Sequence, residues 1–376
     1  MSEKRLNVLY YCMGAFSSSL LLLGSLFLFC DIEINERFFN SFSRFIVATA
    51  GERSFSKLRP NRLRIPPSSL VLKELELKGA SFDNTRNLIS KKVGLHNSFV
   101  VRRDPKRVYR LRPNISLEGY FLLSNKSMSF DGPLLYLDSS KVYSKAVQNY
   151  LKSEAIGKFE VHSDEKGYRK TVPKVSHPLK TLIVGDSVAF GLGVNDDQTL
   201  ASHLQRLLGN ETEVINAGLS GYDTKSNKEV IIDHRDKGIS HLVYIICQND
   251  LETIEGSNNI EKIKKIANDV LQYRNSFKRV SIVFHQYLYE VNPAFFKPGQ
   301  YEKIERFNEA LKSLEAHYEA KDSVRFYNWY NLVGDFNFEK GTSFASFALY
   351  SDHCHFSSLG NFVLAQALAK SYLDKP

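Results

Sequence analysis

Four short groups of polar residues hold the side chains that could do chemistry, and each stands at the end of a predicted element. They are Gly185-Asp186-Ser187, Asn216-Ala217-Gly218, Gln248-Asn249-Asp250 and Asp352-His353-Cys354-His355. The first three follow apolar runs typical of buried strands, and the fourth precedes the last predicted helix. A serine hydroxyl is a weak nucleophile unless a base such as imidazole takes its proton. Because the carboxyl ends of parallel strands meet at one edge of a sheet, we expect the four groups to converge there.

An alternation of strands and helices from residue 180 onward must position these groups. The alternation predicts a parallel sheet with helices on both faces. The predicted strands are Thr181–Val184, Glu213–Asn216, Leu242–Ile246, Val280–Phe284 and Val324–Tyr327, and the predicted helices are Thr199–Leu208, Lys225–Arg235, Ile260–Tyr273, Tyr301–His317 and Ser357–Leu373.

The same four groups resemble the sequence blocks of the SGNH hydrolases, also called the GDSL esterase/lipase family. The blocks are Gly185-Asp186-Ser187-Val188, Gly218 within INAGLSGY, Cys247-Gln248-Asn249-Asp250, and Asp352-His353-Cys354-His355. The resemblance covers roughly residues 178–374, about half of the chain, and its strength lies in four blocks in the right order. It departs from the family at Cys247, where the family usually has Gly. It implies a three-layer α/β/α sandwich that acts on ester bonds without a cofactor or a metal.

The resemblance also implies a role for each residue. Ser187 would be the nucleophile and His355 the base that takes its proton. Asp352 would orient the imidazole and stabilise the imidazolium. An oxyanion hole would be formed by the backbone amides of Ser187 and Gly218 and by the side chain of Asn249, and each such donor can lower the barrier by roughly 2.7–4 kcal/mol.

Purely structural roles are the alternative for several of these residues. Ser187 could merely cap a helix that begins near Val188. Asp186 and Asp250 suit turn or loop support better than catalysis. His353 and Cys354 occupy variable positions of the last block. The other histidines, such as His203, His234 and His285, show no ligand spacing and are expected to be surface or packing residues.

The N-terminus predicts a membrane anchor. Residues 6–30 carry no charge and are long enough to cross a bilayer as a helix. Lys4 and Arg5 precede the run and acidic residues follow it, which places residues 1–5 in the cytoplasm and the rest outside, on the periplasmic side of a bacterial envelope. A cleaved signal peptide is the alternative, but no small-x-small triplet follows the run.

The stretch between the anchor and the α/β domain is less informative. Residues 31–67 resemble a stalk ending in prolines, and residues 68–177 predict an accessory, β-leaning lead-in to the domain at 178–376. Two alternating runs, Val71–Leu77 and Val108–Leu111, predict strands there. Residues 286–300, after the fourth predicted strand, could cover the site or pack on their own domain.

Charge and cysteine content narrow the partners. The net charge of +9 is spread along the chain, which fits a mildly basic surface better than affinity for anionic lipid or acidic polysaccharide. The sequence contains no basic stripe of the kind that would indicate nucleic-acid binding. The four cysteines, Cys12, Cys30, Cys247 and Cys354, form no CxxC pair and no spacing typical of zinc. A disulfide between Cys247 and Cys354 is conceivable, but geometry decides it.

These observations lead to four functional hypotheses. The first is a membrane-anchored serine esterase that cleaves an acyl ester, such as acetate, of an envelope polysaccharide or lipid. An O-acetyltransferase of a surface glycan would use the same residues with an alcohol as acceptor, and would need a membrane partner to supply the acyl group. A protein that binds a glycan or partner without catalysis would keep the fold but not the complete set of reactive residues. A membrane-active lipase is a weaker possibility, because no clearly amphipathic helix supports it.

Overall fold

The computed structural model describes residues 67–78, 80–83, 101–104, 106, 108–122, 134–247, 250–251, 254–292, 299–320, 323–339, 346, 348–351 and 354–373. The predicted anchor at residues 6–30 and the predicted stalk up to residue 66 lie outside this part of the chain. Among the residues that the structure describes, no helix combines the length and the apolar character needed to cross a membrane.

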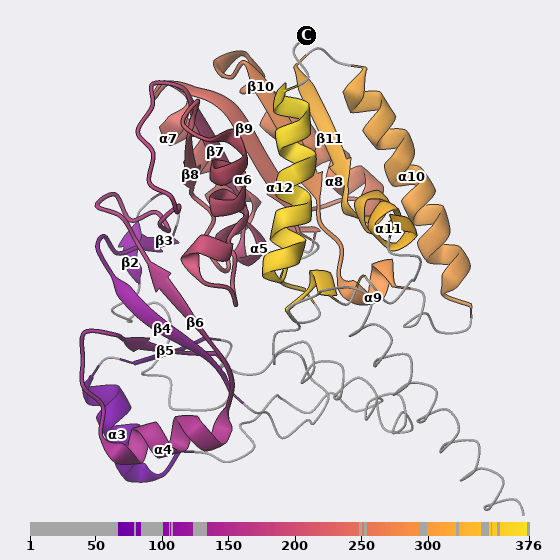
Figure 1. Cartoon of the computed structure of the whole chain (residues 1–376). Helices are drawn as coiled ribbons and strands as arrows, with labels where there is room; N and C mark the ends of the chain where they lie inside the picture. Colours follow the sequence, from indigo (N-terminus) through magenta and orange to yellow (C-terminus); the bar gives the residue numbers. More distant parts are fainter. Residues whose placement is uncertain are drawn as a thin grey trace, which may run out of the picture. The chain divides into compact units, whose positions relative to one another are not determined.

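A five-stranded parallel sheet forms the centre of the C-terminal half (Figure 1). Its order is β11-β10-β9-β7-β8, and every neighbouring pair in it is parallel. The central strand β9 is buried along nearly its whole length, as expected for a strand covered on both faces. The bounds are β7 Lys180–Val184, β8 Glu213–Asn216, β9 Ile239–Ile246, β10 Arg279–Phe284 and β11 Val324–Asn328.

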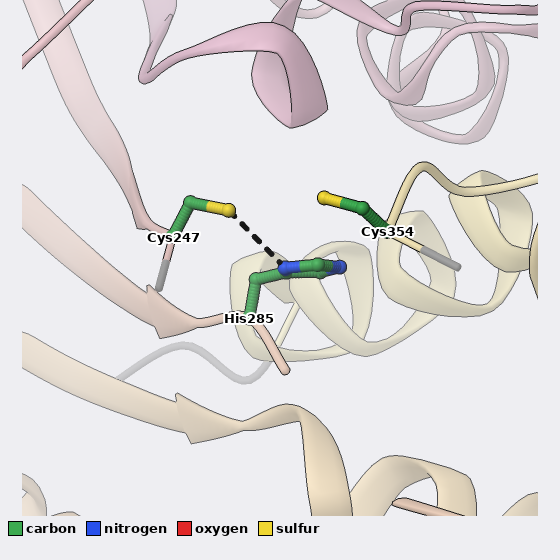
Figure 2. Close-up of side chains that lie close together, drawn as sticks. All are labelled: Cys247, His285 and Cys354. Carbon is green, nitrogen blue, oxygen red and sulfur yellow. Dashed lines mark hydrogen bonds between the residues drawn. The ribbon is translucent and has the colours of Figure 1, made fainter. Parts of the chain in front are cut away.

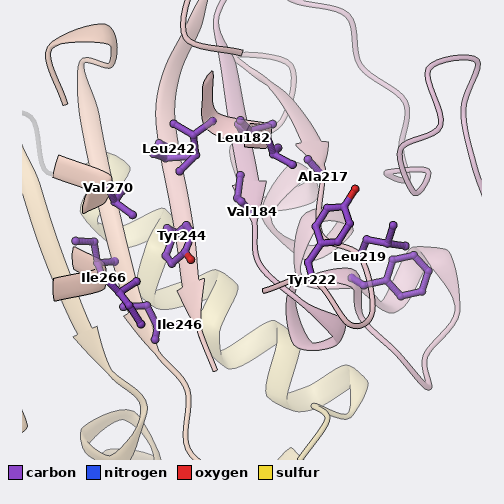
Figure 3. Packing of buried hydrophobic residues seen from close by; sticks show 14 of the residues in the cluster. Leu182, Val184, Ala217, Leu219, Tyr222, Leu242, Tyr244, Ile246, Ile266 and Val270 are labelled. Atoms are coloured by element: carbon purple, nitrogen blue, oxygen red, sulfur yellow. The ribbon is translucent and has the colours of Figure 1, made fainter. Parts of the chain in front are cut away.

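Helices pack against both faces of this sheet, so the predicted three layers are present. On one face α6 and α12 lie side by side (Figure 1). On the other, apolar residues of α7, α8 and α10 share a core with alternate residues of the strands, including Ile282. Figure 3 shows part of this core, with Ile266 and Val270 of α8 near Leu242. The bounds are α6 Leu200–Leu208, α7 Thr224–His234, α8 Asn259–Leu271, α10 Tyr301–Glu319 and α12 Ser358–Leu373.

The sequence predicted these ten elements, with bounds within three residues at each end. It did not predict two helices, α9 Leu288–Val291 and α11 Trp329–Glu339, or the short 3-10 turns at Asp196–Gln198 and Arg274–Ser276. The helix α5 Ser187–Phe190 was considered only in the alternative role of Ser187 as a helix cap. In α11, the glycine at 334 and the asparagines at 331 and 337 are weak helix formers that hide the pattern.

The accessory region is an ordered layer of its own. Four antiparallel strands are arranged in the order β1-β5-β4-β6, and a separate hairpin pairs β2 with β3. The helices α3 and α4 cover the sheet through a second apolar cluster that includes Leu75, Leu135 and Val147. The bounds are α3 Ser69–Leu77, β1 Ser81–Asp83, β2 Val101–Asp104, β3 Val108–Leu111, β4 Ser116–Leu122, β5 Leu134–Asp138, α4 Lys145–Glu154 and β6 Ala155–His162.

One strand prediction in this region is confirmed and one is wrong. Val108–Leu111 is strand β3, whereas Val71–Leu77 lies in helix α3. The alternation of leucine with charged residues suggested a strand. The buried residues are instead Val71 and Leu75, which are four residues apart as on one face of a helix, while Leu77 is 78% exposed. A salt bridge between Glu74 and Lys78, also four apart, adds to the helix.

The accessory sheet and the α/β domain share one core. Leu117, Phe159 and Val161 of the antiparallel sheet belong to the same buried cluster as Leu182 and Phe190 of the domain. Strand β6 then leads through residues 163–179 directly into β7. The β-leaning lead-in is therefore packed on the domain rather than strung before it.

We predict that His241 limits stability in acid. Its side chain lies buried in β9 with Nε2 2.8 Å from Ser281 Oγ, and burial, reinforced by Arg279, lowers its pKa to about 3. The folded state thus binds the proton less tightly than the unfolded chain. The stability that this neutral histidine contributes is complete above about pH 6.5 and is lost as the pH falls toward 3.

The test is His241→Gln, which can keep a partner for Ser281 but does not titrate. Between about pH 6 and pH 4 its free energy of unfolding should fall less than that of the wild type, by about 1.4 kcal/mol per pH unit. His317→Gln, at an exposed position of α10, is the control. Parallel pH dependences for His241→Gln and the wild type would contradict the prediction.

Candidate active site

A sharp turn presents Ser187 after the first strand of the parallel sheet. The backbone of Gly185, directly after β7, has a φ of 155°, and a Cβ there would lie 2.8 Å from Ala189 Cβ and 3.0 Å from the carbonyl oxygen of Ile245. Only glycine fits this turn. The carboxylate of Asp186 accepts a hydrogen bond from the Val188 amide at 3.0 Å and so caps α5. The helix cap considered for Ser187 is thus supplied by Asp186.

Ser187 and His355 are in direct contact. The Nε2 atom of His355 lies 2.9 Å from Ser187 Oγ, although the two residues are 168 positions apart. Ser187 is 9% exposed and His355 is half-buried, so the pair is accessible from one side. This is the distance at which an imidazole can take a proton from a hydroxyl.

A closed turn holds His355 in place. The backbone amide of Ser351 donates to the carbonyl of His355 at 2.8 Å, and the residues on either side, Tyr350 and Phe356, form a β-bridge. The Trp329 indole N–H donates to the Tyr350 hydroxyl at 2.6 Å, and the ring of Trp329 packs on Phe356 with centroids 4.4 Å apart. Helix α11, which begins at Trp329, therefore supports the histidine turn.

Gly218 is positioned close to the serine turn, but its N–H already has a partner. The amide donates to the side-chain oxygen of Asn216 at 3.2 Å. A Cβ at Gly218 would lie 2.5 Å from the backbone nitrogen of Phe190 and 2.7 Å from Ala189, so the residue must be glycine to pack on α5. Another group does approach the backbone of Gly218 closely, and that group is the backbone of α5.

Two predicted site residues, Asn249 and Asp352, lie outside the described residues, as do Gln248 and His353. Asp250 is described and buried. Its carboxylate accepts hydrogen bonds from the Cys247 amide at 2.9 Å and from the Thr224 hydroxyl at 3.4 Å. Burial, together with the charge of Asp186, raises the pKa of Asp250 well above its usual value. These contacts fit the loop-supporting role expected for Asp250.

A buried arginine, which sequence reasoning missed, holds the loop that follows α5. The Nε atom of Arg169 donates to Asp196 Oδ1 at 2.9 Å, and its terminal nitrogens donate to the carbonyl oxygens of Phe190, Gly191, Val194 and Glu160. The guanidinium also stacks over the Phe190 ring. Asp196 in turn accepts from the His162 amide at 3.0 Å. The network joins β6 to α5 and to the loop after it.

Strand β4 of the accessory sheet reaches the same neighbourhood. Gly193, in the loop after α5, has a φ of 91°, and a Cβ there would lie 2.9 Å from the Phe121 ring and 3.2 Å from Ser351 Oγ. Phe121 thus packs where the loop after α5 meets the turn that holds His355. The accessory region therefore contributes to the surroundings of the site.

The segment after β10 packs inward at its beginning. Gln286 is buried and bonds to Asn308 on α10 at 2.6 Å and to the Tyr330 amide at 2.9 Å. Residues 293–298, the part that could cover the site, lie outside the described residues. That this segment covers the site thus stays a prediction, whereas its start fits the alternative of packing on its own domain.

Two cysteines and a histidine meet behind the site. Cys247 and Cys354 are not joined in a disulfide, and both lie with His285 in one buried cluster. The interaction with the Cys354 side chain raises the pKa of the Cys247 thiol well above its usual value, and burial is the next largest cause. Cys247 takes the place of the family's usual glycine without a left-handed backbone, since its φ is not positive. Only the fold brings the three together; Cys247 and His285 each directly follow a strand, which is the one signal that the sequence carried.

A small hollow of about 20 Å³ lies between residues of the accessory region and of the domain. It is lined by Arg110, Leu111, Lys166, Gly167, Tyr168, Ala217, Gly218, Leu219 and Tyr222. Gly218 lines it but neither Ser187 nor His355 does, so the contact between these two, rather than the hollow, marks the candidate site.

No family model and no curated protein matches this chain. It is similar to solved structures of a lipolytic G-D-S-L family member from Veillonella parvula (14% identity, 52% of this chain and 100% of that one, TM-score 0.40) and of a carbohydrate acetylesterase from Sinorhizobium meliloti (17%, 51% and 97%, 0.36). A third is the catalytic domain of a peptidoglycan O-acetyltransferase from Streptococcus pneumoniae (17%, 52% and 95%, 0.32). Similarity this low does not assign a function, which must come from the site itself.

We predict that Arg169→Met costs about 3–5 kcal/mol of unfolding free energy, because it leaves Asp196 buried without its cation. Denaturant unfolding measures the loss. Arg206→Met is the matched control, since Arg206 also bonds to backbone carbonyls but is exposed, and it should cost no more than about 1 kcal/mol. Adding Asp196→Asn should recover part of the loss in Arg169→Met. Equal losses in the two arginine variants would argue against the network.

Proposed function

We propose that this chain is an SGNH-type serine enzyme that cleaves or transfers an acyl group held in an ester bond. The observation that carries the proposal is the 2.9 Å contact between His355 Nε2 and Ser187 Oγ. A serine that merely capped a helix would need no imidazole, and here Asp186 does the capping. A binding protein without catalysis would have no use for this pair.

The reaction would proceed in two steps. Ser187 Oγ attacks the ester carbonyl while His355 Nε2 takes its proton, and the tetrahedral intermediate then collapses as His355 gives that proton to the leaving alkoxide. The alcohol departs and the acyl group stays on Ser187 as an ester. A water or an alcohol, deprotonated by His355, then attacks the acyl-serine and restores the free hydroxyl.

Two further parts of the machinery are proposed on the family resemblance. Asp352 would accept the Nδ1 hydrogen of His355 and stabilise the imidazolium. The Ser187 amide, the Gly218 amide and the Asn249 side chain would bind the oxyanion. Gly218 can take part only if its N–H is shared with, or released by, the Asn216 oxygen that now accepts it.

The proposal for substrate and location rests on the sequence alone. An anchor at residues 6–30 with a cytoplasmic N-terminus would place the enzyme on the outer, periplasmic side of the membrane. Esters accessible there include O-acetyl groups of envelope polysaccharides and acyl groups of lipids. Water as acceptor makes the protein an esterase; a glycan hydroxyl would make it an O-acetyltransferase supplied by a membrane acyl donor. We favour the esterase, because water needs no partner.

Ser187→Ala should lower kcat/KM for a chromogenic acetate ester by at least about 10³-fold, because the acyl-accepting oxygen is gone. The loss of a single buried hydroxyl should leave unfolding nearly unchanged. Ser257→Ala, at an exposed position, should keep full activity. A fluorophosphonate should label the wild type at Ser187 and fail to label Ser187→Ala. Unchanged turnover in that variant, or labelling at another serine, would refute the proposal.

The acceptor can be identified with the same enzyme. With an acetyl ester and an added oligosaccharide, an esterase should release acetate whether or not the sugar is present. Mass spectrometry of the sugar reports transfer, with Ser187→Ala as the blank. Acetylated sugar at the expense of acetate would replace the esterase with the transferase.

A further inference from the structure

Three side chains that bind soft metals converge beneath the catalytic pair. The sulfurs of Cys247 and Cys354 and a ring nitrogen of His285 all lie within 4.8 Å of one another, and Cys247 Sγ is 3.5 Å from His285 Nδ1. Figure 2 shows both sulfurs pointing toward the same space beside the imidazole ring. None of the three has a part in the acyl chemistry proposed above.

The cluster is rigidly built and closed to solvent. Cys247 and His285 directly follow the neighbouring strands β9 and β10, whose register pairs Ile246 with Phe284. The His285 amide continues this ladder by donating to the Ile246 carbonyl at 2.9 Å. Cys247 and His285 are fully buried and Cys354 is 7% exposed. Two of the three ligating atoms are therefore fixed by the sheet, and the third enters from the histidine turn.

The separations fit a bound ion. With Zn–S near 2.3 Å and Zn–N near 2.0–2.1 Å, a tetrahedral site separates sulfur from nitrogen by about 3.6 Å and two sulfurs by about 3.8 Å. The observed 3.5 Å between Cys247 Sγ and His285 Nδ1 matches the first value. The other two separations are no more than 4.8 Å, so these atoms would have to approach one another by about 1 Å at most to bind the ion. A disulfide would instead need the sulfurs at about 2.05 Å and would give His285 no part.

We propose that Cys247, His285 and Cys354 bind one Zn²⁺ ion beneath the candidate active site. Each thiol gives its proton to solvent as its Zn–S bond forms, and His285 binds as the neutral imidazole. The fourth position is left to water or another small ligand. Two thiolates cancel the charge of Zn²⁺, so the buried site is neutral, whereas Cu⁺ would leave a net negative charge where burial penalises it.

The ion would tie together two loops that the proposed reaction uses. Cys247 directly precedes the segment that carries Asn249, and Cys354 directly precedes His355. Both loops would then be anchored to the end of β10 through His285. The metal would thus have a structural role, setting the distance between the oxyanion donor and the base without contacting substrate.

The experiment measures metal on the full-length protein, purified with reductant and without chelator. We expect about one zinc per chain by elemental mass spectrometry. After removal of the metal, Co²⁺ should give the thiolate-to-cobalt charge-transfer absorption of a sulfur-ligated site, and Zn²⁺ should abolish it. Returning Zn²⁺ should raise the thermal unfolding midpoint. Cys247→Ser, Cys354→Ser and His285→Gln should each weaken binding by at least about 100-fold.

Two control variants distinguish this site from the chain's remaining thiols and from the ester chemistry. The double variant Cys12→Ser/Cys30→Ser removes the chain's other cysteines and should keep the cobalt spectrum. Ser187→Ala should bind metal as the wild type does, so metal binding can stand or fall independently of the ester chemistry. Because wild-type measurements alone report stoichiometry and spectrum, a variant that fails to fold does not end the test.

Three results would overturn the proposal. One is a wild-type protein that takes up neither Zn²⁺ nor Co²⁺ while both buried thiols react with iodoacetamide after unfolding. Another is a disulfide between Cys247 and Cys354 whose reduction yields no metal binding. A third is tight binding of Cu⁺ with no affinity for Zn²⁺, which would overturn the assignment of the ion.

Discussion

The hydrogen-bond contact between His355 and Ser187 joins the two ends of the α/β domain. Neither residue can find the other locally, so their distance depends on the whole parallel sheet between them. The serine is held by the turn at Gly185, where the neighbouring atoms leave no room for a side chain. The histidine is fixed from the side, by the turn that Ser351 closes and by the aromatic packing of Trp329 and Phe356. A hydroxyl and an imidazole at 2.9 Å therefore reflect rigid supports on both sides.

The sequence predicted the parallel sheet well, because strands such as β7 and β9 end in apolar runs that polar groups follow. It predicted the wrong element for Val71–Leu77, where leucines spaced for one helix face also alternate with charges. It gave no sign of Arg169, whose five hydrogen-bond acceptors include four backbone carbonyls that have no signature in side-chain pattern. The meeting of Cys247, His285 and Cys354 was equally hidden, because ligand spacing rules apply to neighbours in sequence.

The oxyanion side of the site is arranged differently from the simple expectation. Gly218 was expected to leave room for a substrate oxygen, but its missing side chain leaves room for the backbone of α5. Its N–H donates to Asn216. The amide is thus held in a fixed direction, and in the proposed reaction an incoming oxyanion would have to compete with a neutral amide oxygen. A full negative charge is the stronger acceptor, which favours the charged intermediate over the uncharged ester.

The position of Arg169 has a consequence for where this protein can be divided. A fragment that began at residue 178, at the start of the parallel sheet, would keep every residue of the proposed chemistry. It would nevertheless lack the guanidinium, and Asp196 and the carbonyls of the loop after α5 would lose their buried donors. The apolar face that Phe159 and Val161 now cover would also be exposed. The catalytic unit therefore extends back through β6, and the accessory sheet is an integral wall of it rather than a separable module.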